Sequence, residues 1–226
     1  MNVHSITEVA GLIGEPGRIR MLATLLDDKT HSASELAMAA DVSAQTASSH
    51  LSKLLAGGLI VAERQGRQRL YRLRDSDVAN AIEALGALAS PDKPAEVPEL
   101  RFARSCYDHL AGVLAIAMRN QLLKRDALRQ VQDSFTLTKG GERFLADFGI
   151  DAVELRQLRR SFAGKCLDWT ERHHHIGGAV GAALLSRFLE LKWLARMRKT
   201  RAVRVTHEGE RGFEKVFGIS RRTLGK

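Results

Sequence analysis

The residues best suited to chemistry lie in the second half of the chain, in the segment CLDWTERHHH at residues 166–175. Thiolate, carboxylate and imidazole groups are the side chains that bind zinc, nickel and copper in proteins. A second pair, Cys106 and His109, falls one turn apart on a predicted long helix. The candidate metal or effector site consists of Cys106, His109, Cys166, Asp168 and His175. The expected ligand is a transition-metal ion or a thiol-reactive compound.

The same segment also fits a purely structural role. Its spacing matches no standard zinc finger, and three successive histidines on a helix would point in different directions. In this alternative Asp168 or Thr170 caps a helix, Trp169 packs into the core and the histidines meet water. The two cysteines are then buried, inert hydrophobic side chains that lie far apart. The sequence leaves both alternatives open.

Motifs for catalysis are missing from the sequence. It contains no P-loop, no GxGxxG at the start of a helix, and no GxSxG or HExxH. Cys166, Asp168 and the histidines that follow lie too close together in sequence to face one another as a nucleophilic triad. We therefore predict that the protein is not an enzyme.

The most regular pattern in the chain runs from Ser43 to Tyr71 and predicts a helix, a stop and a hairpin. Ser43 is a good N-cap, because its hydroxyl can accept a hydrogen bond from a free amide of the first turn. Gly57 and Gly58 end the helix, since glycine adopts left-handed backbone at little cost. Two short strands follow, joined by a turn at Gln65-Gly66-Arg67. The apolar stripe of the helix consists of Ala47, Leu51, Leu54 and Leu55.

The opposite face of this helix is short and polar, which suits DNA recognition. A helix about 10–12 Å in diameter fits the major groove, where small polar side chains reach base edges. Arginines around the hairpin turn would meet phosphates or enter a minor groove. The predicted DNA-contacting residues are Ser43, Gln45, Thr46, Ser49, His50, Lys53, Arg64, Arg67 and Arg69.

This stretch also resembles a known family. Ser48-Ser49-His50-Leu51, Leu54 and Gly57-Gly58-Leu59-Ile60 resemble the helix-to-wing segment of ArsR/SmtB-type winged-helix repressors. Upstream, Ala33-Ser34-Glu35-Leu36-Ala37 resembles the first helix of that family's helix-turn-helix. The resemblance covers about the first ninety residues. It implies a winged-helix repressor that binds a double-stranded DNA operator as a homodimer and is released by an effector.

The metal sites that this family often uses are missing here. They consist of cysteines in the first helix of the helix-turn-helix, or of Asp, His and Glu on the helix after the wing. The first place holds Glu35–Ala40 without a thiol, and the second holds Asp77–Asn80 without a histidine further along that helix. A small effector is therefore expected to bind the additional C-terminal domain.

Composition predicts a soluble, cytoplasmic protein. The 226 residues are 44% hydrophobic and 27% charged, and the net charge is +9. Residues 1–90 have a net charge of −1 and residues 91–226 of +10, so the bulk charge does not come from the predicted DNA-binding half. Two cysteines suit a reducing compartment, and we expect no signal peptide and no contact with a membrane.

Proline content predicts the domain organisation. Ser90–Pro98 holds three of the four prolines, so we expect a DNA-binding domain at residues 1–89, a linker at 90–99 and an effector or dimerisation domain at 100–226. Apolar residues repeat at helical spacing from Leu100 to Leu128, which predicts one long helix. The stripe expected to pair two copies consists of Val78, Ile82 and Leu85, with help from Phe102 and Leu110.

The second half also carries a candidate repeat. A shift of 134 residues aligns the helix and hairpin of the first domain with residues 151–219, which predicts a degenerate winged-helix-like unit there. The alternative is chance similarity between two amphipathic stretches. The similar segments Thr138–Arg143 and Thr206–Arg211 favour duplication. The counterpart of the recognition helix, Gly178–Ala183, has no groups that read bases, so this unit is expected to pack, pair or sense.

The predicted fold class is mainly α with small β-hairpin wings: a winged helix-turn-helix domain followed by a helical, winged-helix-like C-terminal domain. The predicted function is a DNA-binding transcriptional regulator, acting as a repressor released by an effector. The alternative is a metal- or thiol-responsive enzyme or carrier that uses the winged helix to bind another protein.

Overall fold

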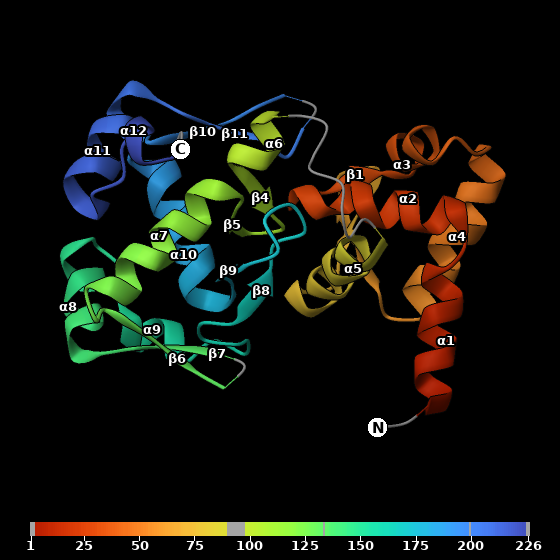
Figure 1. The fold of residues 1–226 in the computed structure, drawn as a ribbon. Helices are drawn as coiled ribbons and strands as arrows, with labels where there is room; N and C mark the ends of the chain where they lie inside the picture. The colour runs from red at the N-terminus through yellow and green to blue at the C-terminus, as the bar shows by residue number, and fades with distance from the viewer. Residues whose placement is uncertain (1–2, 90–97, 133, 199, 225–226) are drawn as a thin grey trace. The chain divides into compact units, whose positions relative to one another are not determined.

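The computed structural model describes residues 3–89, 98–132, 134–198 and 200–224 (Figure 1). The chain forms two compact units, Met1–Ile82 and Glu83–Lys226, which we call the N-terminal and C-terminal units. Their division falls inside α5 (Ser76–Ala89). Most of the predicted linker lies outside the described residues, and its last two positions, Pro98 and Glu99, begin a short helix.

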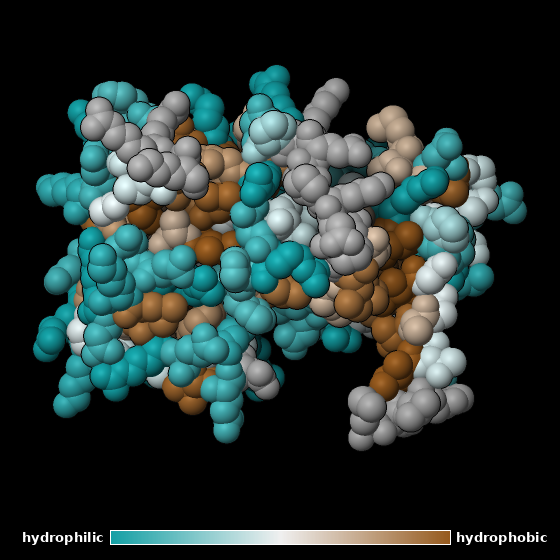
Figure 2. All heavy atoms as spheres, in the orientation of Figure 1, coloured by the Kyte–Doolittle hydropathy of each residue, from teal (hydrophilic) through white to brown (hydrophobic). Residues whose placement is uncertain are grey.

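The N-terminal unit is a helix-turn-helix with a three-stranded sheet in the order β1-β3-β2. Its elements are α1 (Val3–Ile13), α2 (Pro16–Thr24), η1 (Leu25–Asp27), β1 (His31–Ser32), α3 (Ala33–Ala40), α4 (Ala44–Ala56), β2 (Ile60–Gln65), β3 (Gln68–Leu73) and the start of α5. The predicted recognition helix and wing are confirmed as α4 and the β2–β3 hairpin. In Figure 2 hydrophobic colour follows α1, where Ile6 and Val9 are exposed.

Local capping explains where the helices of this unit begin. Ser32 accepts a hydrogen bond from the Glu35 amide, and the Glu35 carboxylate accepts one from the Ser32 amide, which forms a capping box on α3. Ser43 accepts from the Thr46 amide at the start of α4. The α4 stripe packs inward as predicted, with Ala47, Leu51 and Leu54 all buried. The two helices of the helix-turn-helix are therefore held by caps and by a common core.

The C-terminal unit consists of helices separated by short antiparallel hairpins. Its elements after α5 are α6 (Pro98–Phe102), β4 (Arg104–Cys106), β5 (His109–Ala111), α7 (Val113–Lys124), β6 (Leu128–Val131), β7 (Ser134–Leu137), α8 (Lys139–Asp147), α9 (Ala152–Arg156), β8 (Lys165–Leu167), β9 (His174–Ile176), α10 (Gly178–Glu190), β10 (Leu194–Arg196), β11 (Val203–Val205), α11 (His207–Phe217) and α12 (Arg221–Leu224).

The predicted long helix from Leu100 to Leu128 is wrong. The segment forms α6, the β4–β5 hairpin and α7, with Tyr107 in the left-handed backbone region at the hairpin turn. All residues of β4 and β5 are buried, so their side chains show no alternation of apolar and polar positions. Buried strands of this kind cannot be distinguished from a buried helix by periodicity.

One arrangement of elements occurs twice in the C-terminal unit. A hairpin, a helix, a second hairpin and a second helix follow each other in β4-β5-α7-β6-β7-α8 and again in β8-β9-α10-β10-β11-α11. The last helix of each set begins at a threonine whose hydroxyl accepts from the amide three residues on, Thr138 from Gly141 and Thr206 from Gly209. The predicted shift of 134 residues also relates α4 to α10. Within this unit, however, the more complete repeat is between its own two halves.

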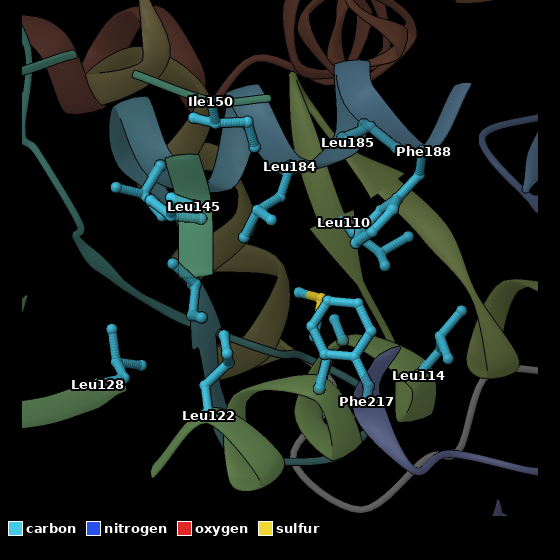
Figure 3. Close-up of a cluster of buried hydrophobic side chains, with 14 of the residues drawn as sticks. Leu110, Leu114, Leu122, Leu128, Leu145, Ile150, Leu184, Leu185, Phe188 and Phe217 are labelled. Atoms are coloured by element: carbon cyan, nitrogen blue, oxygen red, sulfur yellow. The ribbon is translucent and has the colours of Figure 1, made fainter. Parts of the chain in front are cut away.

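The two halves share one hydrophobic core and interlock. α10 of the second half lies against β5 of the first, and α7 of the first lies against β9 of the second (Figure 1). Leucines from both halves and the rings of Phe188 and Phe217 converge in the core (Figure 3). In the part of the chain that the structure describes, no helix is long and apolar enough to span a bilayer.

Candidate functional site

The outer face of α4 is a polar surface on a rigid helix. Gln45, Thr46, Ser49 and Lys53 are all exposed, and they lie on the side opposite the buried stripe. Ser43 lies at the start of this face and is engaged in the cap. The sequence prediction therefore agrees with the structure on the exposure of these five residues.

His50 differs from the other residues predicted to contact DNA. Its side chain is 12% exposed, and its Nε2 lies 3.4 Å from Oε2 of Glu15. A Cβ added at Gly17 would lie 3.1 Å from the same ring nitrogen, so the imidazole packs on the start of α2. Hydrogen bonds from the Gly17 and Arg18 amides, together with the electrostatic effect of the His50 and Arg18 side chains, hold the pKa of Glu15 below its usual value. In this structure His50 fixes α4 against α2 and does not lie on the exposed face.

The wing carries three exposed arginines. Arg64 on β2 and Arg69 on β3 are direct cross-strand partners, and Arg67 lies in the turn between the strands. The Arg69 guanidinium lies 5.5 Å from the centre of the Tyr71 ring. Like charges placed opposite each other in a hairpin repel. The tip of the wing therefore concentrates positive charge at an energetic cost to the isolated protein.

Four predicted metal ligands meet inside the C-terminal unit. Cys106 pairs across its hairpin with His109, and Cys166 pairs across the equivalent hairpin with His175. Cross-strand partners project from the same face of a hairpin, and here the two faces meet. The four ligand atoms lie within 4.8 Å of one another, and all four side chains are buried. The two sulfur atoms are 3.7 Å apart, and the two Nε2 atoms are 3.1 Å apart.

Each of the two buried histidines has a carboxylate behind it. Nδ1 of His109 lies 3.2 Å from Oδ1 of Asp108, and Nδ1 of His175 lies 3.3 Å from Oδ2 of Asp168. Each carboxylate is paired in turn with an arginine from outside its own half of the unit. Arg104 of β4 binds Asp168 at 2.9 Å, and Arg160, in the segment before β8, binds Asp108. The two halves therefore contribute the same cysteine, histidine and aspartate, and neither half supplies the arginine for its own aspartate.

Asp168 organises the second hairpin and is not one of the four converging ligands. It accepts hydrogen bonds from the Gly112 amide at 2.6 Å and from the Thr170 and Glu171 amides of its own loop. Burial opposes its ionisation, but the His175 ring and the Arg104 guanidinium hold the pKa of Asp168 well below its usual range. Asp168 therefore lies beside His175 as a buried carboxylate whose charge is balanced by Arg104.

The local structure predicted around these residues needs two corrections. Cys106 and His109 are not on one helix, because β4 and β5 carry them. The segment from Cys166 to His175 is not the start of a helix, because a hairpin with the loop at Asp168 occupies it. His175 is buried in β9, whereas His173 and His174 are exposed. Four of the five predicted side chains therefore lie together, although the local structure predicted around them is wrong.

The sequence prediction missed Arg104, Asp108 and Arg160. A short repeat was available that identifies one of them: Phe-Ala-x-x-Cys-x-Asp occurs at residues 102–108 and again at 162–168. This repeat aligns Cys106 with Cys166 and Asp108 with Asp168. The two arginines have no such signal, because their role depends on pairing between distant segments.

Comparisons with known proteins agree with the N-terminal architecture. A family model described as a helix-turn-helix domain matches residues 13–63. The chain is 46% identical over 221 residues to the HTH-type transcriptional regulator YdfF of Bacillus subtilis, covering 95% of this chain and 98% of that protein. It is 34% identical over 85 residues to the HTH-type transcriptional regulator CmtR of Mycobacterium bovis, covering 38% of this chain and 71% of that protein.

One similar solved structure is a homodimeric winged helix-turn-helix DNA-binding domain from Mycobacterium bovis. The two sequences are 27% identical, the TM-score is 0.36, and the match covers 39% of this chain and 81% of the other. The similarity to YdfF extends through both units of the present chain. This chain therefore belongs to the HTH-type transcriptional regulators.

Proposed function

We propose that this transcriptional regulator represses by binding a duplex operator as a homodimer, and that an effector held by the C-terminal unit releases it. The observation that carries the DNA-binding part is the pair Arg64 and Arg69, placed opposite each other at the wing tip with Arg67 in the turn. Repulsion within this group is relieved when an anion approaches. A DNA phosphate backbone supplies such anions in a regular row.

The exposed face of α4 is suited to reading bases beside that backbone contact. The amide of Gln45 can pair in two places with adenine, and the hydroxyls of Thr46 and Ser49 can contact either base of a pair. Lys53 lies near the end of the helix, where a phosphate contact fixes its orientation. The proposal therefore assigns base contacts to α4 and phosphate contacts to Lys53 and the wing.

The homodimer is proposed from apolar side chains on α5. Leu85 is 43% exposed and Leu88 is 72% exposed, although both are large aliphatic residues. Val78 and Ile82, predicted on the same stripe, are already buried within one chain, and Leu110 belongs to the core of the C-terminal unit. A two-fold dimer places its recognition helices about 34–36 Å apart, one turn of DNA. Light scattering at micromolar concentration should give twice the chain mass, and a monomer would contradict this proposal.

The C-terminal unit is proposed as the place where the effector acts. It contains the buried cysteine and histidine cluster, whose side-chain types favour a transition-metal ion. An effector shifts the DNA-binding equilibrium only if it binds the two states with different affinity. We assign no catalytic step to this cluster, and propose that the protein is not an enzyme.

The DNA contacts are tested by selecting an operator and measuring affinity with purified variants. Gln45→Ala should weaken the selected operator by about 1–3 kcal/mol and relax preference at one base position. Arg67→Ala should weaken all duplexes alike and reduce the slope of affinity against salt concentration by about one unit. Arg159→Ala, an exposed arginine of the C-terminal unit, is the matched control for charge. Parental binding by both test variants would contradict the assignment of α4 and the wing.

A further inference from the structure

We propose that Cys106, His109, Cys166 and His175 bind one zinc ion in a closed tetrahedral site, which joins the two repeated halves of the C-terminal unit. Each half contributes one cysteine and one histidine from a single hairpin. Two ligands do not complete a zinc site, whereas the four together do. The proposal does not depend on DNA binding, because all four residues lie in the C-terminal unit.

Two of the six separations between ligand atoms, sulfur to sulfur and nitrogen to nitrogen, lie close to the edges of a zinc tetrahedron, and all six are within 4.8 Å. Zinc–sulfur bonds of about 2.3 Å place two tetrahedral sulfur ligands about 3.8 Å apart, and zinc–nitrogen bonds of about 2.0–2.1 Å place two nitrogens about 3.3–3.4 Å apart. The observed separations are 3.7 Å for the sulfurs and 3.1 Å for the Nε2 atoms. A disulfide needs a sulfur separation of about 2.0 Å, so the cysteines lie at the distance of shared ligands and not of a covalent bond.

The carboxylates behind the rings also favour a metal. Oδ1 of Asp108 lies 3.2 Å from Nδ1 of His109, and Oδ2 of Asp168 lies 3.3 Å from Nδ1 of His175, which is the placement of a carboxylate behind a metal-binding histidine. When Nδ1 carries the ring proton, the lone pair of each ring is on Nε2, and the two Nε2 atoms lie 3.1 Å apart inside a buried site. Two lone pairs at this distance repel unless a cation lies between them. A metal ion shared with the two sulfurs satisfies both rings at once.

Charge balance is consistent with a divalent ion. Two thiolates neutralise a doubly charged metal, and the two aspartates are neutralised by Arg104 and Arg160. The buried group as a whole then carries no net charge, which avoids the large cost of an uncompensated ion in the interior. A mixed sulfur and imidazole set of four is the ligand set that favours zinc over harder ions such as magnesium.

A glycine lies directly against the ligand residues. Gly177 follows β9, and a Cβ added there would lie 3.3 Å from Nε2 of His109 and 3.5 Å from Cβ of Cys166. The small residue therefore keeps a side chain away from the place where the ligand atoms converge. This is a specific role for one glycine of the Gly/Ala-rich start of α10.

Cobalt binding to the reduced full-length protein is the first test. After treatment with a chelator, Co²⁺ should bind at one equivalent per chain and give the strong visible absorption of a tetrahedral ion, with sulfur charge-transfer bands in the near ultraviolet. Zinc should displace it. Cys106→Ser and Cys166→Ser should each weaken cobalt affinity at least 100-fold. Asp108→Asn, which leaves every ligand in place, should weaken it about 10–100-fold.

His174→Ala is the matched control, because His174 lies in the same strand as His175 but is exposed. It should keep parental affinity. If the cysteine variants do not fold, X-ray absorption of the zinc-loaded parent decides the question, and should report two sulfur and two nitrogen neighbours.

Several outcomes would overturn the proposal. They are a weak octahedral cobalt spectrum, half an equivalent of metal per chain, or equal loss of affinity in His174→Ala and His175→Ala. Mild oxidation that joins Cys106 to Cys166 in a protein whose reduced form binds neither cobalt nor zinc would instead identify a redox pair.

Discussion

Asp168 gives the sharpest stability prediction. Its side chain and that of Arg104 are both fully buried, and they form an ion pair at 2.9 Å. Asp168→Ala removes the charge that neutralises Arg104 and leaves the Gly112 amide without its acceptor. An uncompensated buried charge costs about 3–5 kcal/mol, and an unpaired buried amide about 1–3 kcal/mol. Because neighbouring effects do not add fully, we expect the unfolding free energy of the C-terminal unit to fall by about 4 kcal/mol.

The repeated half supplies a matched comparison. Asp108 and Arg160 make the equivalent pair, but their side chains are 15% and 23% exposed. Water can reach Arg160 when its partner is removed, so Asp108→Ala should cost about 1–2 kcal/mol. The double variant Asp168→Ala with Arg104→Met removes the orphaned charge as well. It should recover about half or more of the stability lost in the single variant.

Urea unfolding of chelator-treated protein measures these differences. Both tryptophans, Trp169 and Trp193, belong to the C-terminal unit, so their fluorescence reports on it separately. With a slope of about 2 kcal/mol per molar urea, the Asp168→Ala midpoint should fall by about 2 M. Arg104 stacks on Trp169, with its guanidinium carbon 4.7 Å from the ring centre, so circular dichroism should confirm the midpoint of the double variant. Equal losses for Asp108→Ala and Asp168→Ala would refute the reasoning from burial.

Three further predictions follow from particular contacts. Gly141→Ala should destabilise the C-terminal unit by about 1–3 kcal/mol in urea unfolding, because the new Cβ would lie 1.9 Å from the Ala127 carbonyl oxygen. The control is Gly86→Ala in α5, which should be neutral or stabilising because no atom lies within contact distance of the added Cβ. Hydrogen bonds from the Ser32 amide and hydroxyl lower the pKa of Glu35 in the folded protein. The capping box should therefore stabilise the fold fully at pH values above the pKa that Glu35 has in the unfolded chain. This stabilisation should be lost as the pH falls through the lower pKa of the folded state. The stability difference between Glu35→Gln and the parent, measured by denaturation at several pH values, should therefore shrink in acid. Zinc should change operator affinity at least fivefold in a mobility-shift titration, and unchanged affinity would separate metal binding from regulation.

The N-terminal unit could be predicted from sequence because its signals are local. A serine cap, a helical stripe and a Gly-Gly stop all lie within one helix length, and the wing follows directly. His50 is the exception. Its burial depends on Glu15 and Gly17, which pack from another helix, and no pattern within α4 indicates that contact.

The C-terminal unit was harder to predict because its strands are short, and because two of them, β4 and β5, are buried on both faces. Strands of three residues, such as β4 and β8, are too short to show a period of two. The chemistry of the site was visible in residue types, but its geometry depends on which hairpins face each other. Cys106 and Cys166 are sixty positions apart, and only the interlocked packing of the two halves brings them together.

Because the C-terminal unit consists of two similar halves, the four-ligand site depends on how these halves pack together. Each hairpin holds its cysteine and histidine as a cross-strand pair, which is formed locally and supplies only two ligands. The other two ligands come from the opposite half, and each aspartate is neutralised by an arginine from outside its own half. A four-ligand site therefore exists only when the halves are packed together, and an ion that binds the packed form stabilises it. At a free concentration one hundred times its Kd, such an ion contributes about 2.7 kcal/mol, which is comparable to the coupling energies that regulate binding at a distant site.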